Sequence, residues 1–111
     1  MIDFLMFPKK NRLSKKSDVL LVLKRGRKFT RGICNIYFLE GDLEKEPRVT
    51  VVVSKKVSTS SVARNRVKRI FREILRPRIG GMRKGLNIVV VAKKEILGRQ
   101  RDFIERALGD F

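Results

Sequence analysis

The segment 63–72, ARNRVKRIFR, carries the side chains best suited to binding chemistry, because five of its ten residues are Arg or Lys. Four of the five are arginines, whose planar guanidinium groups bind phosphate through two parallel hydrogen bonds. No Asp or Glu occurs from residue 47 to residue 72, against eight Lys or Arg, so these cations have no local acid to pair with. The segment therefore predicts a contact with a polyanion.

A helix over 61–76, ended by Pro77, divides this segment into two faces. At about 100° per residue, an apolar arc of Val67, Ile70, Phe71 and Ile74 separates from a cationic arc. The cationic arc holds Arg64, Asn65, Lys68, Arg69, Arg72 and Arg76, with Arg66 at its border. Like charges four residues apart repel by a few tenths of a kcal/mol per pair. We expect the apolar arc to pack on a sheet and the cationic arc to bind phosphates of a polyanion.

Further cations flank this helix in the sequence. Lys55 and Lys56 end the preceding strand, and Arg12, Lys15 and Lys16 lie near the first helix. Two interpretations of these residues remain: they are ordinary charged residues at the ends of a strand and a helix, or they extend the phosphate-binding face. Arg12, Lys55 and Lys56 are included in the predicted RNA-binding set.

The side chains needed for protein-borne nuclease chemistry are scarce. The chain has no His, which usually serves as acid or base, and four of its eleven acids lie together in a predicted turn. That group, Glu40, Asp42, Glu44 and Glu46, lacks a recognised spacing of metal ligands. The single cysteine, Cys34, lies in a strand-like stretch and is expected to pack in the core. We predict no protein active site and no tightly held metal.

Composition points to the same class of partner. The chain of 111 residues is expected to form a single RNA-binding domain over 1–111, and its net charge of +17 favours a nucleic-acid partner. Its apolar runs fall short of the ~20 residues that span a bilayer, so no membrane partner is expected. One cysteine excludes an internal disulfide and fits a reducing cytoplasm. No obligate protein partner is predicted.

Hydrophobic periodicity predicts an α+β fold, with one sheet packed against helices. Strands over 33–40 and 48–57 are expected to form an antiparallel hairpin, and residues 28–32 to add a short edge piece. The near-continuous apolar run of the strand over 86–94 suggests a central, doubly buried position. The expected order is helix 17–26, strand 33–40, strand 48–57, helix 61–76, strand 86–94 and helix 99–111. Ser14 or Ser17 is expected to cap the first helix.

Three segments in this order resemble the bacterial ribonuclease P protein component: NRLSKKSDVLLVLKRGRKF, RVTVVVSKKV and ARNRVKRIFREIL. The Arg-Asn-Arg followed by Lys-Arg, after a strand that ends Ser-Lys-Lys, is the most specific feature. The similarity covers about residues 11–94. It implies a cofactor for a catalytic RNA that removes the 5′ leader from precursor tRNA, with Mg²⁺ supplied through the RNA. It also implies a left-handed βαβ crossover, an exception to the usual handedness.

The resemblance also implies a division of labour between two surfaces. The helix with Arg64, Asn65, Arg66, Lys68, Arg69 and Arg72 would bind the catalytic RNA. A cleft between the first helix and the sheet would accept the single-stranded leader, at positions that match Val19, Leu23 and Tyr37. The family often carries Phe at the first two of these positions, where this chain has aliphatic residues, so only Tyr37 offers a ring for stacking.

Two other functions remain as alternatives. A ribosomal or other structural RNA-binding protein would share the charge and the topology. A DNA-binding regulator is disfavoured, because the sequence shows no helix-turn-helix pair and no dimerising segment that would set half-site spacing.

Overall fold

The structure, a computed structural model, describes residues 7–109. It confirms the predicted α+β class, with three α-helices and one four-stranded sheet. The short edge strand predicted near residues 28–32 is present and pairs antiparallel with the next strand. The elements are α1 (Lys16–Arg25), β1 (Arg27–Thr30), β2 (Cys34–Glu40), β3 (Arg48–Val52), α2 (Ser61–Leu75), β4 (Leu86–Ala92) and α3 (Arg101–Leu108), with 3₁₀ turns at Lys9–Asn11, Arg76–Gly81 and Lys94–Ile96.

The predicted hairpin of β2 and β3 is wrong, because β4 lies between these two strands. The sheet order is β1-β2-β4-β3, in which β4 runs antiparallel to β2 and parallel to β3. The connection 41–47 passes around the start of β4, where Gly41 N–H donates to Gly85 O at 2.7 Å and Gly85 N–H donates to Lys45 O at 2.8 Å. The central position predicted for the apolar run 86–94 is thereby confirmed.

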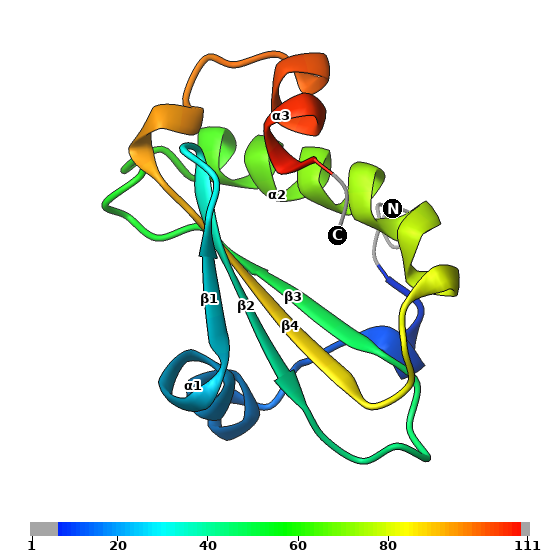
Figure 1. The fold of residues 1–111 in the computed structure, drawn as a ribbon. Helices are drawn as coiled ribbons and strands as arrows, with labels where there is room; N and C mark the ends of the chain where they lie inside the picture. Colours follow the sequence, from blue (N-terminus) through cyan, green and yellow to red (C-terminus); the bar gives the residue numbers. More distant parts are fainter. Residues whose placement is uncertain (1–6, 110–111) are drawn as a thin grey trace.

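Helices cover both faces of the sheet (Figure 1). Helices α2 and α3 lie on one face over a core that includes Ile36, Phe71, Val90 and Ile104. Helix α1 lies on the other face, where it contacts β2 and β4 over a smaller core of Leu13, Val22 and Val89.

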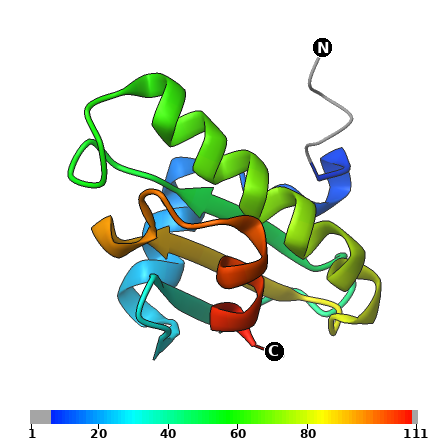
Figure 2. The same ribbon diagram turned by 90° about the horizontal axis from the view of Figure 1, so that it is seen from above.

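The connection from β3 through α2 to β4 is a left-handed crossover. In Figure 2 the parallel strands β3 and β4 run toward the left, α2 lies on the side of the viewer, and β4 lies below β3. Strands of this direction with a helix in front would place β4 above β3 in the usual right-handed connection. The handedness implied by the family resemblance is therefore present.

The first helix ends at Gly26 as predicted, but it begins differently. Its N-cap is Lys15, without a side-chain hydrogen bond, so neither Ser14 nor Ser17 caps it as predicted. Its C-cap is Gly26, where a Cβ would lie 2.5 Å from Val22 O and 2.8 Å from Phe38 O. Only glycine allows the chain to leave α1 this close to β2.

The last helix buries Ile104 and Leu108, as its apolar spacing predicted. Phe103 stays 37% exposed, with the Arg99 guanidinium 4.5 Å from its ring centroid. Phe111, expected to join this face, lies outside the described residues. Among the described residues, no helix has both the length and the apolar character needed to cross a bilayer.

The core position predicted for Cys34 is confirmed, since the residue is fully buried. Burial raises the pKa of the Cys34 thiol to about 11 from 9.0, although the positive charges of Arg31 and Lys93 partly oppose the increase. The reactive species of a cysteine is the thiolate, so this thiol is poorly suited to nucleophilic chemistry.

We predict that the folded protein resists alkylation by iodoacetamide at mildly alkaline pH and reacts readily once unfolded.

The neutral thiol of Cys34 favours the folded state below pH 9, and this contribution to stability is lost as the pH rises from about 9 to about 11. Denaturation of the wild type and of Cys34→Ala across this range tests the point. Their difference in free energy of unfolding should shrink with rising pH, and a constant difference would contradict the assignment.

Candidate RNA interface

The two faces predicted for α2 are present. Its buried side chains are Val67, Ile70, Phe71, Ile74 and Leu75. The first four form the predicted apolar arc, and Leu75 adds to it at the end of the helix. The N-terminus is held by Ser60, whose Oγ accepts a hydrogen bond from Ala63 N–H at 3.2 Å. The cationic arc is therefore presented by a capped helix that is packed along its opposite side.

One row of cations runs along α2 at Arg64, Lys68 and Arg72, all half-buried. The Arg64 Nη1 donates to Ser58 O at 3.0 Å, which ties the guanidinium to the loop before the helix. Burial lowers the pKa of Arg72, and the nearby charge of Arg12 lowers it further. Arg12 itself forms a parallel bridge to Val49 of the edge strand β3. Arg12 therefore lies beside β3 and close enough to Arg72 for the two charges to interact, and its contact with RNA stays a prediction.

The other predicted residues of α2 point in different directions. Asn65 and Arg69 are exposed. Arg66 is also exposed, but its Nη2 donates to Arg99 O at 3.3 Å, on the side of α3. The border position predicted for Arg66 is therefore confirmed, and this residue lies farther from the Arg12 side than the rest of the set.

Lys55 and Lys56 are exposed in the turn after β3, which ends at Val52 and not at the lysines as predicted. A hydrogen bond from Lys56 N–H to Ser54 Oγ at 3.3 Å fixes this turn. The turn leads into the loop before α2, so both lysines precede the N-terminal end of the cationic arc in the chain.

Five acids of the described residues form ion pairs, none of them with the cations of the predicted RNA-binding set on α2. The ion pairs within residues 7–109 join Asp18 to Arg48, Glu40 to Arg83, Glu46 to Lys84, and both Glu73 and Glu105 to Arg101. Arg64, Arg66, Lys68, Arg69 and Arg72 thus have no carboxylate partner in the described part of the chain. No carboxylate of residues 7–109 compensates their mutual repulsion, which favours an external polyanion.

The three residues predicted to contact the leader lie together on the other face of the sheet. Val19, Leu23 and Tyr37 are half-buried and pack against the core of Leu13 and Val22. We call this the α1 surface; its half-buried apolar members are Val19, Leu23, Tyr37, Leu39, Val52 and Val91. It lies across the sheet from α2, so the two predicted RNA contacts occupy opposite faces.

Sequence reasoning placed Asn35 on the same strand face as Tyr37 but did not name it as a candidate site residue. It lies two positions before Tyr37 on β2 and beside Val91 of β4. Its Oδ1 is buried without a hydrogen-bond partner among the described residues. A buried acceptor without a partner is costly, so a donor from a bound molecule would relieve it. The signal in the sequence was a polar residue at a position that alternates in step with Tyr37.

The described residues offer no evident site for a catalytic metal. Within residues 7–109, no three His, Cys, Asp or Glu side chains form a group that could hold a metal ion. The acidic turn over 40–46 instead supplies Glu40 and Glu46 to ion pairs with Arg83 and Lys84.

Comparison with known proteins assigns the family. The sequence profile named Ribonuclease P matches residues 7–111. The chain is 36% identical over 87 residues to the ribonuclease P protein component of Dictyoglomus thermophilum, covering 78% of this chain and 71% of that protein. It is 31% identical over 101 residues to that of Clostridium acetobutylicum, covering 90% and 84%.

Solved structures agree with the sequence relatives. The RNase P protein from Thermotoga maritima superposes with a TM-score of 0.76 and 28% identity, covering 87% of this chain and 90% of that one. The fold is shared with the RNase P protein of Staphylococcus aureus, at a TM-score of 0.78, 24% identity and 88% coverage of each chain. On the family profile, the relatives and the fold, this chain belongs to the bacterial ribonuclease P protein component family.

Proposed function

We propose that this protein is the subunit of a bacterial ribonuclease P that binds the catalytic RNA through α2 and the 5′ leader of precursor tRNA through the α1 surface. Family membership supports the first part. The observation that carries the assignment of α2 is its row of Arg64, Lys68 and Arg72, which no carboxylate of the described chain neutralises. The cytoplasm is the proposed location, because the catalytic RNA and precursor tRNA are found there.

The chemistry of cleavage is assigned to the RNA partner. The chain has no His, the described residues gather no metal-binding group, and Cys34 is buried with a raised pKa. Mg²⁺ is accordingly assigned to RNA phosphates and would activate the attacking water there. The protein contributes positive charge and binding surface, which favour the folded, metal-bound form of the RNA.

The arginines of α2 suit an RNA backbone for geometric as well as electrostatic reasons. Arg64 is held by Ser58 O, so its position is set before RNA arrives and less side-chain entropy is lost on binding. Arg72 and Arg12 lie close enough for the charge of one to lower the pKa of the other. A phosphate between them would replace this repulsion with two attractions.

Leader binding rests mainly on Tyr37. Its ring is half-buried in the α1 surface, and stacking of a base on such a ring contributes roughly 1–3 kcal/mol. Val19 and Leu23 add apolar contact without a ring, so this chain gains less from stacking at those positions than a relative with phenylalanines would.

The direct test is precursor tRNA processing by a bacterial ribonuclease P RNA at low Mg²⁺, with and without this protein. We expect the protein to restore leader removal under conditions where the RNA alone is nearly inactive, because its cations replace part of the required counterion charge. Absence of any gain would refute the proposal. Stable co-sedimentation with ribosomal subunits would instead support the structural RNA-binding alternative.

The double variant Arg64→Ala/Lys68→Ala should weaken binding to the catalytic RNA and flatten its salt dependence. Loss of two phosphate contacts should reduce the slope of log affinity against log salt by about 1.4–1.8. The matched control is Lys45→Ala/Arg106→Ala, which removes the same charge from two exposed residues outside α2. Equal slopes for both double variants would show that net charge, and not the α2 row, governs binding.

Photocrosslinking can separate the two proposed surfaces. A precursor with photoreactive bases in its leader should crosslink to the peptide that contains Tyr37, whereas a photoreactive catalytic RNA should crosslink to α2. Peptide mapping by mass spectrometry measures both. The reverse pattern would overturn the division of labour between the surfaces.

A further inference from the structure

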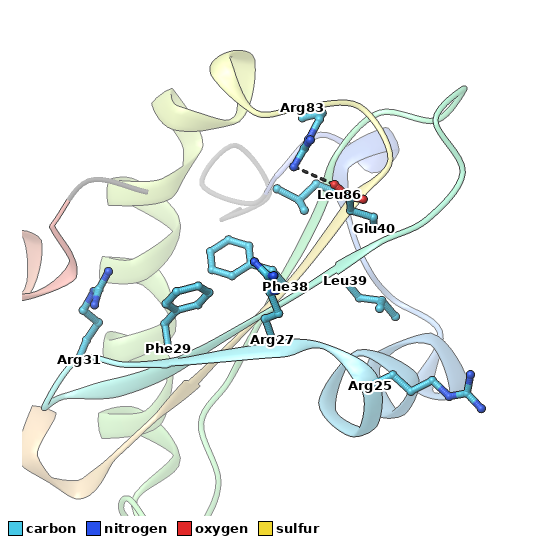
Figure 3. A pocket seen from close by; sticks show the side chains of 9 residues that line it. All are labelled: Arg25, Arg27, Phe29, Arg31, Phe38, Leu39, Glu40, Arg83 and Leu86. Carbon is cyan, nitrogen blue, oxygen red and sulfur yellow. Dashed lines mark ion pairs between the residues drawn. The ribbon is translucent and has the colours of Figure 1, made fainter.

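A pocket of about 770 Å³ lies at the β1 edge of the sheet, where it adjoins the α1 surface and includes no residue of α2. We call it the β1 pocket. Figure 3 shows it from close by; the residues that the argument uses are Arg27, Phe29, Arg31, Phe38, Glu40 and Arg83. They come from β1 and its following turn, from β2, and from the loop before β4.

An open aromatic ring forms the centre of the β1 pocket. Phe29 is 41% exposed although it is a large apolar residue. It contacts Phe38 edge-to-face, with ring centroids 5.4 Å apart and an interplanar angle of 81°. Phe38 packs against the main core, so it holds the position of Phe29 from below while much of the Phe29 ring stays accessible.

Cations flank this ring on both sides along β1. Arg27 and Arg31 lie two residues before and after Phe29, and Figure 3 shows all three side chains at the pocket. Arg31 is anchored at the rim, because its Nε donates to Leu108 O at 3.2 Å. Within residues 7–109, no carboxylate forms an ion pair with Arg27 or Arg31.

The one acid of the pocket is already neutralised. Glu40 Oε2 lies 2.8 Å from Arg83 Nη2. The pocket therefore presents an excess of guanidinium groups beside an exposed ring.

Charges on an edge strand can also prevent pairing with the strand of another molecule, and Lys28 on β1 suits that role. This role does not require an exposed phenylalanine, so it does not explain the exposed ring of Phe29.

We infer that the β1 pocket binds an unpaired nucleotide of the precursor tRNA leader, an inference that rests on the proposed function. Aromatic rings beside cations are the means by which proteins hold single-stranded nucleic acid without reading a fixed sequence. The base lies against Phe29, and Arg27 and Arg31 bind the adjoining phosphates.

The β1 pocket is continuous with the α1 surface. Leu39 belongs to the half-buried cluster of the α1 surface and also lines the pocket, as does Arg25 at the end of α1. In Figure 3 both side chains lie on the α1 side of β2. A leader strand that leaves the α1 surface past Leu39 thus reaches Phe29 around the β1 edge without crossing α2.

The test measures binding of precursor tRNA and of leaderless tRNA to the complex of the full-length protein with catalytic RNA. Phe29→Leu keeps the apolar volume but removes the ring, and Phe29→Tyr keeps the ring. We expect Phe29→Leu to weaken precursor binding about tenfold, with leaderless tRNA bound as by the wild type. Phe29→Tyr should behave as the wild type.

The matched control is Phe103→Leu, which removes another exposed phenylalanine that has an arginine beside it. It should leave precursor binding unchanged. The double variant Phe29→Leu/Tyr37→Leu should show the sum of the two single losses in free energy, because the side chains lie on opposite faces of the sheet. Equal losses from Phe29→Leu and Phe103→Leu would overturn the inference.

Two further results would also overturn it. The first is that the Phe29→Leu variant binds precursors of every leader length as tightly as the wild type does. The second is that Phe29→Leu weakens the binding of leaderless tRNA as much as the binding of precursor tRNA, which would place the contact on the catalytic RNA. Failure of the wild-type protein to stimulate processing at all would refute the proposed function itself. That result is measured without any variant, so the two failures are distinguishable.

Discussion

The burial of β4 on both faces is the constraint on which the rest of the structure depends. Val89 and Val90 are consecutive residues, and each is fully buried, the first under α1 and the second under α2 and α3. Because β4 is covered on both faces, it contributes side chains to two separate hydrophobic cores, one on each face of the sheet. Under the proposed function, this arrangement places one RNA surface on each face of a protein of 111 residues, so that the catalytic RNA and the leader would not compete for the same side.

The electrostatic design follows from where the acids lie. Among the described residues, no ion pair involves Arg64, Lys68, Arg69 or Arg72; Glu73, the only acid of α2, pairs with Arg101 of α3. The repulsion within the arc lowers the stability of the free protein. A bound RNA backbone would remove this cost, so part of the affinity comes from relief of strain that the protein carries alone. Apolar packing of Val67 and Phe71 holds α2 in place meanwhile.

Local patterns predicted the elements well and their pairing poorly. The two faces of α2 followed from periodicity, since Val67, Ile70, Phe71 and Ile74 recur at helical spacing. The hairpin of β2 and β3 was wrong, because periodicity identifies strands without identifying their partners. The β1 pocket escaped notice because its residues come from segments 27–31, 38–40 and 83–86, which only the tertiary fold brings together. The alternation of Arg27, Phe29 and Arg31 was its one trace in the sequence.

The strand order also constrains how the chain acquires its shape during synthesis. While only the first 85 residues have left the ribosome, β1 and β2 can pair, but β3 has no neighbour, since its strand partner is still to come. Addition of β4 supplies the missing neighbour to β2 and β3 at once, and α3 then completes the main core with Ile104 and Leu108. Assembly of the sheet is therefore a late event, and a nascent chain stalled before residue 92 would expose two unpaired strand edges to aggregation or to chaperones.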